Sequence, residues 1–268
     1  MYKILALDID GTLTNSAKEV TPKVKNALFE LYKRDIPILL VSGRPTEGIL
    51  PIAKEIELEE NNGYILAFNG GKIINAATKE VIYQKSVPGE YVQEICDFAL
   101  DNDLAVLTYK NGDIITNKPE DEYVQIEARI NKLKAVKVDN VASEAPEAPD
   151  KFLIVGAPEV IGDKLPIMQK KFEGRLNIFC SEPYFMEIVP LGIDKAQSLE
   201  LLLSKLGLTR EELMACGDGG NDVTMVNYAG MGVAMANACK AVLEVADFVT
   251  TSNDEDGVAV AIEKYFNI

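Results

Sequence analysis

Short apolar runs separated by amphipathic stretches mark the first part of the chain. Residues 4–7 lack the apolar and polar alternation of a half-exposed strand, so they predict a strand that is covered on both faces. Thr21-Pro22 then opens an amphipathic stretch, with the composition of a helix N-cap followed by a first-turn proline. Apolar runs at 36–41 and 64–68 predict two further buried strands. A helix between buried strands indicates a βαβ crossover and a parallel sheet.

The same kind of pattern returns after Gly192. Helices are predicted at residues 193–206, 223–228 and 257–266, and strands at residues 213–216, 232–235 and 248–250. These elements continue the sheet that the N-terminal part begins. The pattern as a whole therefore predicts an α/β fold with a parallel-sheet core.

Between these two parts the pattern changes. The predicted helices lie at residues 90–100, 120–133 and 158–172, and the predicted strands at 104–109, 113–116, 152–155, 176–180 and 185–189. Paired short strands suit hairpins rather than a βαβ succession, so we interpret residues 84–189 as an inserted α+β domain. Hinges are expected at 87–89 and 190–192, and the acidic, Pro-rich tract 143–150 is expected to be a solvated loop.

Two aspartates end the first apolar run. Asp8 and Asp10 stand two residues apart in DIDGT, and the following Gly11 and Thr12 favour a tight loop whose N–H groups can approach an anion. Ligands of open α/β sheets bind at the carboxyl ends of the strands, which is where this loop is predicted. An ordinary acidic turn has the same spacing, so the interpretation depends on the residues at the other strand ends.

Polar groups also follow the other predicted strands or begin a helix. They are Ser42, Lys195, Asp218, Asn221 and Asp222. Each has an ordinary explanation: Ser-Gly is common in turns, a lysine near a helix start is usually solvated, and GDGGND could be a flexible loop or half of a calcium loop. Their joint occurrence at strand ends favours a site for phosphate chemistry.

Several carboxylates gathered at one sheet edge would repel one another and raise their pKa values unless a cation lay among them. Mg²⁺ is the expected cofactor, because it prefers oxygen ligands and can bridge carboxylates to a substrate phosphate.

Composition narrows the classes of function. The chain has 268 residues, 47% of them hydrophobic, which suffices for a buried core in one or two domains. A net charge of -15 without a basic run argues against nucleic acid and anionic lipid as partners. Histidine is absent, which excludes His-based acid–base catalysis and His-ligated zinc. The four cysteines are widely spaced, and we expect buried, reduced thiols.

The first predicted strand begins within three residues of the N-terminus, and no apolar run approaches the ~20 residues that a membrane helix needs. We therefore expect a cytoplasmic protein without a signal peptide. The sequence does not predict an oligomeric state.

The segments DIDGT, LLVSGR, GIDKAQSL and GDGGND, in this order, resemble the four motifs of the haloacid dehalogenase superfamily of phosphatases. The long insertion between the second and third motifs is similar to that of the Cof-type branch, which has a large α/β cap of the C2B type. The closest likeness is to the sugar phosphatases of this branch. The resemblance covers essentially the whole chain. It implies a Rossmann-like catalytic core at residues 1–83 and 190–268 and a substrate-selecting cap at 84–189.

The resemblance also implies a role for each candidate residue. Asp8 would be the nucleophile that forms an aspartyl-phosphate, and Asp10 would be the general acid and base. Mg²⁺ would be held by Asp8, the carbonyl of Asp10 and Asp218, with Asp222 in support. The residues that would bind the phosphate or substrate are Ser42, Gly43, Arg44, Lys195 and Asn221.

These expectations describe a Mg²⁺-dependent phosphatase of small phosphorylated metabolites, with sugar phosphates as the expected substrates. One alternative is a phosphatase of another metabolite, such as a cofactor or flavin-precursor phosphate. A mutase is disfavoured because nothing marks an acceptor site. A further alternative is a sensor that binds a phosphorylated ligand without turnover, which would need neither a nucleophile nor a proton shuttle.

Overall fold

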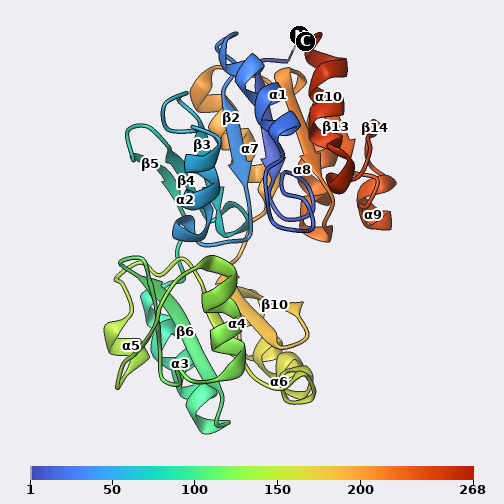
Figure 1. Cartoon of the computed structure of the whole chain (residues 1–268). Helices are drawn as coiled ribbons and strands as arrows, with labels where there is room; N and C mark the ends of the chain where they lie inside the picture. Colours follow the sequence, from blue (N-terminus) through green and yellow to red (C-terminus); the bar gives the residue numbers. More distant parts are fainter. Residues whose placement is uncertain (1) are drawn as a thin grey trace. The chain divides into compact units, whose positions relative to one another are not determined.

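The computed structural model describes residues 2–268, which form two compact units. Among the described residues, the core unit comprises 2–83 and 194–268. The inserted unit comprises Gln84–Ile193. The sequence interpretation had divided the chain at 83/84 and 189/190. Each unit contains its own sheet and helices (Figure 1).

The core unit is built on an eight-stranded sheet of order β14-β13-β12-β1-β2-β3-β4-β5. Its strands are β1 Ile4–Asp8, β2 Ile38–Val41, β3 Tyr64–Ala67, β4 Lys72–Asn75, β5 Val81–Gln84, β12 Leu213–Gly217, β13 Met231–Ala234 and β14 Phe248–Val249. The pairings from β14 to β3 are parallel, and β4 runs antiparallel to β3. The predicted α/β fold with a mainly parallel core sheet is confirmed.

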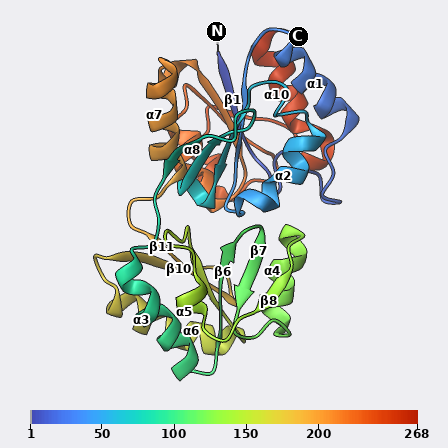
Figure 2. The ribbon, with the colours of Figure 1, turned by 90° about the vertical axis from the view of Figure 1, so that its left-hand side faces the viewer.

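Helices cover both faces of this sheet. They are α1 Pro22–Tyr32, α2 Thr46–Glu55, α7 Lys195–Leu206, α8 Val223–Tyr228, α9 Lys240–Leu243 and α10 Gly257–Phe266. In Figure 2, α7 and α8 lie on one side of β1, and α1, α2 and α10 lie on the other. This double cover explains why every residue of β1 is buried and why its sequence is apolar without alternation.

Helix α1 begins as its sequence predicts. The Thr21 side chain accepts a hydrogen bond from the N–H of Val24, and Pro22 occupies the first turn. Because proline lacks the N–H that the first turn would leave unpaired, it costs nothing there. The apolar face of α1, including Leu28 and Leu31, is buried.

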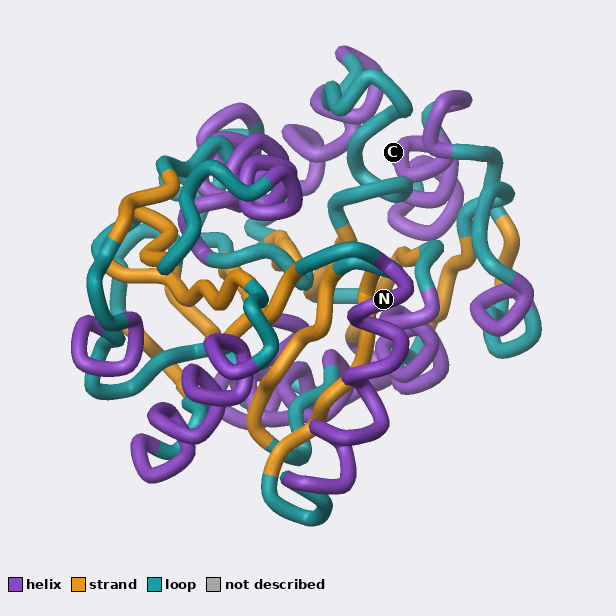
Figure 3. The backbone as a smooth tube through the Cα atoms, turned by 90° about the horizontal axis from the view of Figure 1, so that it is seen from below, coloured by secondary structure: helices purple, strands orange, loops and turns teal. Residues whose placement is uncertain are grey.

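The inserted unit has a six-stranded mixed sheet of order β10-β11-β9-β6-β7-β8. Its strands are β6 Ala105–Lys110, β7 Asp113–Thr116, β8 Ala135–Lys137, β9 Phe152–Val155, β10 Leu176–Glu182 and β11 Phe185–Pro190. Its helices are α3 Gly89–Asp101, α4 Glu122–Asn131, α5 Val141–Glu144 and α6 Pro158–Lys171. All pairings are antiparallel except that of β7 with β8. Figure 3 colours the helices and strands of the chain by type.

The two faces of the inserted sheet are covered differently. Val106 of β6 packs in an apolar cluster with residues of α3 and α6. Tyr109 stands three positions further along β6 and therefore points to the other face, where its hydroxyl reaches Glu127 of α4.

Several helices and strands were not predicted, and all of them except α2 are short. They are α2, β4, β5, β8, α5 and α9. Pro51 interrupts the helical pattern of α2, while β5 is a four-residue strand at the edge of the sheet with no buried residue. The short segments carry too few buried apolar positions to show a period, whereas α2 has five buried residues and was missed because of the proline inside it. None of the helices within residues 2–268 has the length and apolarity needed to cross a bilayer.

The cysteine expectation was partly wrong. All four cysteines are free, and Cys96 and Cys216 are buried as predicted. Cys239 is exposed and Cys180 is half-buried. Cys239 is the N-cap residue of the short helix α9, and its side chain makes no capping hydrogen bond.

Candidate active site

The carboxyl ends of three neighbouring core strands bring the predicted motifs together. Asp8 is the last residue of β1 and is 6% exposed. It pairs with Val41 of β2, so Ser42 follows directly beside it. On the other side of β1, β12 ends at Gly217, immediately before Asp218. The parallel register therefore makes three loops meet at one edge, as the sequence pattern predicted.

Lys195 lies at the centre of this edge and is 1% exposed. Its Nζ donates to Asp8 Oδ1 at 2.7 Å and to Asp222 Oδ1 at 2.5 Å, and it lies 3.4 Å from the Val41 carbonyl oxygen. The position of Lys195 follows from the start of α7, where the Asp194 side chain caps the helix by accepting from the N–H of Gln197. The lysine is therefore a buried bridge between two carboxylates rather than a solvated residue.

The loop after β12 is folded around the Asp222 side chain. Asp222 Oδ2 accepts hydrogen bonds from the N–H groups of Asp218 and Gly219 at 3.0 and 2.9 Å. The Thr12 hydroxyl donates to Asp218 Oδ1 at 2.7 Å. Gly11, at φ +85°, lies so close that a Cβ there would overlap the Asp218 carboxylate. The two acidic loops thus approach each other closely because a glycine stands between them.

The electrostatics of this edge favour a bound cation. Burial and repulsion from Asp222 raise the pKa of Asp8 well above its usual range, although Lys195 opposes the shift. Burial also raises the pKa of Asp218. Burial lowers the pKa of Lys195, but attraction to Asp8 and Asp222 outweighs it, so the net shift is upward and the lysine stays protonated.

One oxygen from each of Asp8, Asp218 and Asp222 lies within 4.8 Å of the others. One ammonium group faces these three carboxylates, so their charges are not balanced by the protein alone. An all-oxygen donor set with excess negative charge fits a hard divalent cation.

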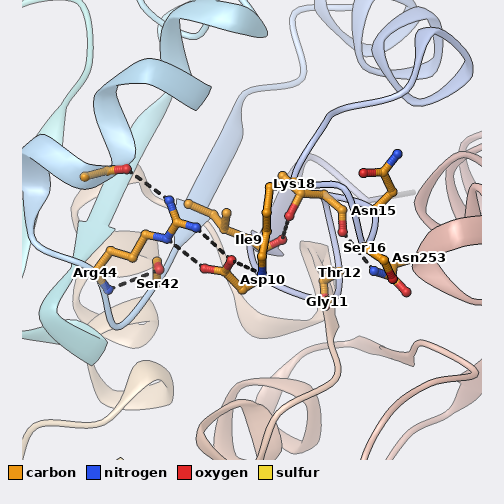
Figure 4. A network of polar contacts seen from close by, with 12 residues as sticks. Ile9, Asp10, Gly11, Thr12, Asn15, Ser16, Lys18, Ser42, Arg44 and Asn253 are labelled. Atoms are coloured by element: carbon orange, nitrogen blue, oxygen red, sulfur yellow. Dashed lines mark hydrogen bonds and ion pairs between the residues drawn. The ribbon is translucent and has the colours of Figure 1, made fainter. Parts of the chain in front are cut away.

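Asp10 is held by two cations from different segments (Figure 4). Arg44 Nε and Nη2 donate to Asp10 Oδ2 and Oδ1, each at 2.7 Å, and Lys18 Nζ donates to Oδ1 at 2.8 Å. Burial raises the pKa of Asp10, but the hydrogen bonds and charge of Arg44 and Lys18 outweigh it and hold the pKa below its usual value. The Asp10 carboxylate thus accepts two hydrogen bonds from the planar guanidinium of Arg44 and a third from Lys18.

The loop after β2 is fixed by Ser42 and its neighbours. Ser42 is 3% exposed, its hydroxyl accepts from the Arg44 N–H at 3.2 Å, and its own N–H donates to the Leu66 carbonyl at 2.9 Å. A Cβ at Gly43 would lie 3.0 Å from Asn69 Nδ2, so the glycine permits a close approach. The Asn69 side chain also accepts from Asn221 Nδ2 at 2.9 Å, which links this loop to the loop after β12.

The structure divides the predicted residues into two hydrogen-bonded groups. Lys195 joins Asp8 to Asp222, whose side chain in turn holds the Asp218 N–H. The second group comprises Asp10, Ser42 and Arg44. Asn221 is exposed and contacts Asn69 rather than either group.

Sequence reasoning missed Lys18. This residue follows Asp10 by eight positions in a stretch without periodicity, so no pattern marked it. A turn returns the chain so that Lys18 lies near Asp10. In this turn the N–H of Lys18 donates to the Asn15 carbonyl at 2.9 Å, and Lys18 has φ +64°. A cation folded back on the carboxylate is a tertiary feature that spacing alone does not reveal.

Comparison with known proteins agrees with this geometry. The family model of the haloacid dehalogenase-like hydrolases matches residues 5–262. A crystal structure of a haloacid dehalogenase-like hydrolase from Bacteroides thetaiotaomicron has a TM-score of 0.96 and 45% sequence identity, and the match covers 98% of this chain and 99% of that one. A provisionally named phosphatase of Bacillus subtilis, YxeH, is 33% identical over 267 residues, 98% of each chain.

Two other similar proteins have names that state a substrate. A subclass IIB sugar phosphatase, BT4131, has a TM-score of 0.81 and 25% identity, with 99% of this chain and 100% of that chain covered. The 5-amino-6-(5-phospho-D-ribitylamino)uracil phosphatase YcsE of Bacillus subtilis is 28% identical over 268 residues, with 98% of this chain and 95% of that protein covered. The two names agree on phosphatase activity and differ in substrate.

Proposed function

This chain belongs to the family of haloacid dehalogenase-like hydrolases, and we propose that it is a Mg²⁺-dependent phosphatase that hydrolyses sugar phosphates through an aspartyl-phosphate. The observation that carries the proposal is the buried bridge from Lys195 to Asp8 and Asp222 at the end of β1. The Lys195 ammonium opposes the rise in the Asp8 pKa that burial and Asp222 cause, and a bound cation would oppose it further, which favours the ionised carboxylate that can act as a nucleophile.

In the proposed reaction, an Asp8 oxygen attacks phosphorus while the bond from phosphorus to the leaving oxygen breaks. Asp10 gives its proton to the departing alcohol. Water then attacks phosphorus and loses a proton to Asp10, which releases phosphate and restores the Asp8 carboxylate. Asp10 stands two residues from the nucleophile on the same loop, which places it near both steps. Arg44 and Lys18 favour its ionised form, so to act as the acid it must take up a proton when the negative charge of the substrate phosphate offsets their charges.

The proposed Mg²⁺ site uses the Asp8 and Asp218 carboxylates and the Asp10 carbonyl, with Asp222 supporting the loop. This donor set fits the ion because all its atoms are oxygens and its carboxylates outnumber the one ammonium group. When bound, Mg²⁺ offsets the repulsion between the nucleophile and the phosphate. Within the protein, Asp222 holds the Asp218 N–H and thereby orients the loop that carries the second carboxylate.

The proposed phosphate site is formed by side chains and N–H groups in the loops after β2 and β12 and at the start of α7. Its residues are Ser42, Gly43, Arg44, Lys195 and Asn221. Ser42 and Lys195 are buried, so their donors are already oriented before substrate binds.

For the substrate, we propose a sugar phosphate selected by side chains of the inserted unit, which acts as the cap domain. The core motif residues contact only groups that all phosphomonoesters share, so they cannot distinguish one sugar from another. The likeness to the sugar phosphatase BT4131 supports this substrate class. The likeness to YcsE supports the second candidate, a phosphatase of another phosphorylated metabolite.

A panel of phosphorylated metabolites, assayed for phosphate release with and without Mg²⁺, tests the activity and the substrate class together. We expect Mg²⁺-dependent turnover of p-nitrophenyl phosphate and the highest kcat/KM on a sugar phosphate. A higher kcat/KM on a non-sugar metabolite would favour the second candidate. Binding of phosphorylated compounds without any turnover would instead indicate a sensor.

Exchange of the inserted unit, Gln84–Ile193, for that of a relative with another preference tests where specificity resides. We expect the ranking of kcat/KM among sugar phosphates to change while Mg²⁺ dependence and the need for Asp8 persist. A folded chimera that keeps the original ranking would place specificity in the core unit.

A further inference from the structure

Lys18 stands out among the lysines of the core unit because its ammonium reaches Asp10. Its side chain is 63% exposed and that of Asp10 is 37% exposed. An ion pair this exposed contributes little to stability, because water screens it and both side chains lose freedom. Arg44 already binds both oxygens of Asp10, so the lysine is not needed to neutralise the carboxylate.

The loop that carries Lys18 is nevertheless fastened firmly. Asp254, in the turn before α10, accepts from the N–H and the hydroxyl of Ser16, both at 2.7 Å. Asn253 Nδ2 donates to the Thr14 carbonyl at 3.0 Å (Figure 4). These bonds join segments more than 230 positions apart in the chain, and they hold the loop on each side of residue 15.

A second asparagine extends this attachment to the catalytic turn itself. Asn237 Nδ2 donates to the Gly11 carbonyl at 2.8 Å, and Asn237 Oδ1 accepts from the Asn253 N–H at 3.0 Å. The loop is thus tied to the C-terminal segment at Gly11, Thr14 and Ser16, directly before the turn that returns Lys18 to Asp10.

Lys18 and Arg44 Nη2 share one oxygen of Asp10, whereas Arg44 Nε binds the other. The two hydrogen bonds from the Arg44 guanidinium fix the plane of the Asp10 carboxylate, but they permit the guanidinium and the carboxylate to move together. A third donor from a separately anchored loop removes that freedom.

Resting on the proposed function, we infer that Lys18 is a positioning residue for Asp10, and that Asp254 acts on the same carboxylate through Ser16 and the loop. Lys18 fixes the direction in which Asp10 meets the leaving oxygen. Its loss removes this orientation and therefore affects most those substrates whose leaving group needs a proton, although losing its charge would by itself make Asp10 easier to protonate.

The test compares two leaving groups. The kcat/KM values of an alkyl sugar phosphate and of p-nitrophenyl phosphate are measured with Mg²⁺ for Lys18→Met, Lys18→Arg and Asp254→Asn. Because kcat/KM reports the steps up to departure of the leaving group, it isolates proton donation from hydrolysis of the intermediate. Lys25→Met is the matched control, because Lys25 also forms a partly exposed ion pair, with Glu55 at 2.9 Å, but away from Asp10.

We expect Lys18→Met to lower kcat/KM about tenfold on the alkyl ester and less than about threefold on the aryl ester, a fraction of what general acid catalysis supplies. Lys18→Arg should restore most of the alkyl activity. Asp254→Asn should give the same selective loss to a smaller extent, and Lys25→Met should change neither value.

Equal losses on the two esters, or no loss, in Lys18→Met would overturn the inference. Those outcomes differ from failure of the proposed function, in which the wild-type protein itself would show no Mg²⁺-dependent turnover of either ester.

Discussion

Each unit of the molecule buries a lysine in an ion pair, but the two environments differ. In the core unit, Lys195 contacts Asp8 and Asp222, with Asp218 beside them. In the inserted unit, Lys151 Nζ lies 3.2 Å from Glu187 Oε2, and the two side chains are only 4% and 8% exposed.

The difference lies in charge balance. In the inserted unit one ammonium group faces one carboxylate, with the Tyr109 ring 5.7 Å from the ammonium. The nearby Glu127 carboxylate accepts instead from Tyr109 and Asn131. In the core unit one ammonium group faces three carboxylates. A balanced buried pair can serve the fold alone, whereas an unbalanced cluster must take up protons or bind a further cation to offset its charge.

The largest difference between the two buried lysine sites is expected when Asp8 is substituted. Asp8→Asn keeps the shape of the cluster but removes the nucleophilic charge, so kcat should fall by at least about 10⁴-fold while the circular dichroism spectrum is unchanged. Asp35→Asn, at an exposed turn after α1, serves as the control and should retain activity. Near-normal turnover by the Asp8 variant would show that the unbalanced cluster is not catalytic.

Metal removal should have the next largest effect. EDTA should abolish turnover, Mg²⁺ should restore it, and Ca²⁺ should restore it poorly because calcium prefers longer bonds and more ligands. Mg²⁺ should also raise the Tm of the wild-type protein, since a ligand that binds only the folded state stabilises it. The Lys151→Met variant should keep this response and Asp218→Asn should lose most of it. Full activity with Ca²⁺, or an unchanged response in Asp218→Asn, would contradict the assignment.

The balanced pair should matter for stability alone. Lys151→Met leaves Glu187 buried without its partner and should lower the free energy of unfolding by about 3–5 kcal/mol, measured by urea denaturation. The double variant Lys151→Met/Glu187→Leu should recover most of that loss, because it removes both buried charges. If the double variant were as unstable as the single one, the pair would contribute more than mutual neutralisation.

In both units, some elements were predicted from the sequence and others were not. Most buried strands and amphipathic helices were found in both units, because burial sets their apolar periods: β7, β9, α8 and α10 have the predicted bounds, whereas α2, with Pro51 inside it, was missed. Short edge elements such as β5 and β8 were missed because half-exposed residues carry no such period.

At the candidate site, sequence reasoning found the groups that stand at strand ends, since a parallel register must bring them together. Asp8 and Asp218 are of this kind. It did not find Lys18, which a loop returns to Asp10 over eight positions, or the attachment by Asp254, which joins segments 238 positions apart. Contacts between loops depend on individual hydrogen bonds and leave no periodic pattern in the sequence, so only the three-dimensional structure shows them.

The most direct test of the central claim is to trap the phosphoryl group on Asp8. Asp10→Ala should still transfer phosphate from p-nitrophenyl phosphate, whose leaving group needs little protonation, but it should hydrolyse the intermediate slowly. Acid quenching in the presence of Mg²⁺, followed by peptide mass spectrometry, should then find one phosphate on the peptide that contains Asp8. Steady turnover of the wild-type protein with no covalent phosphate on that peptide in the variant, or with phosphate on another residue, would contradict the account.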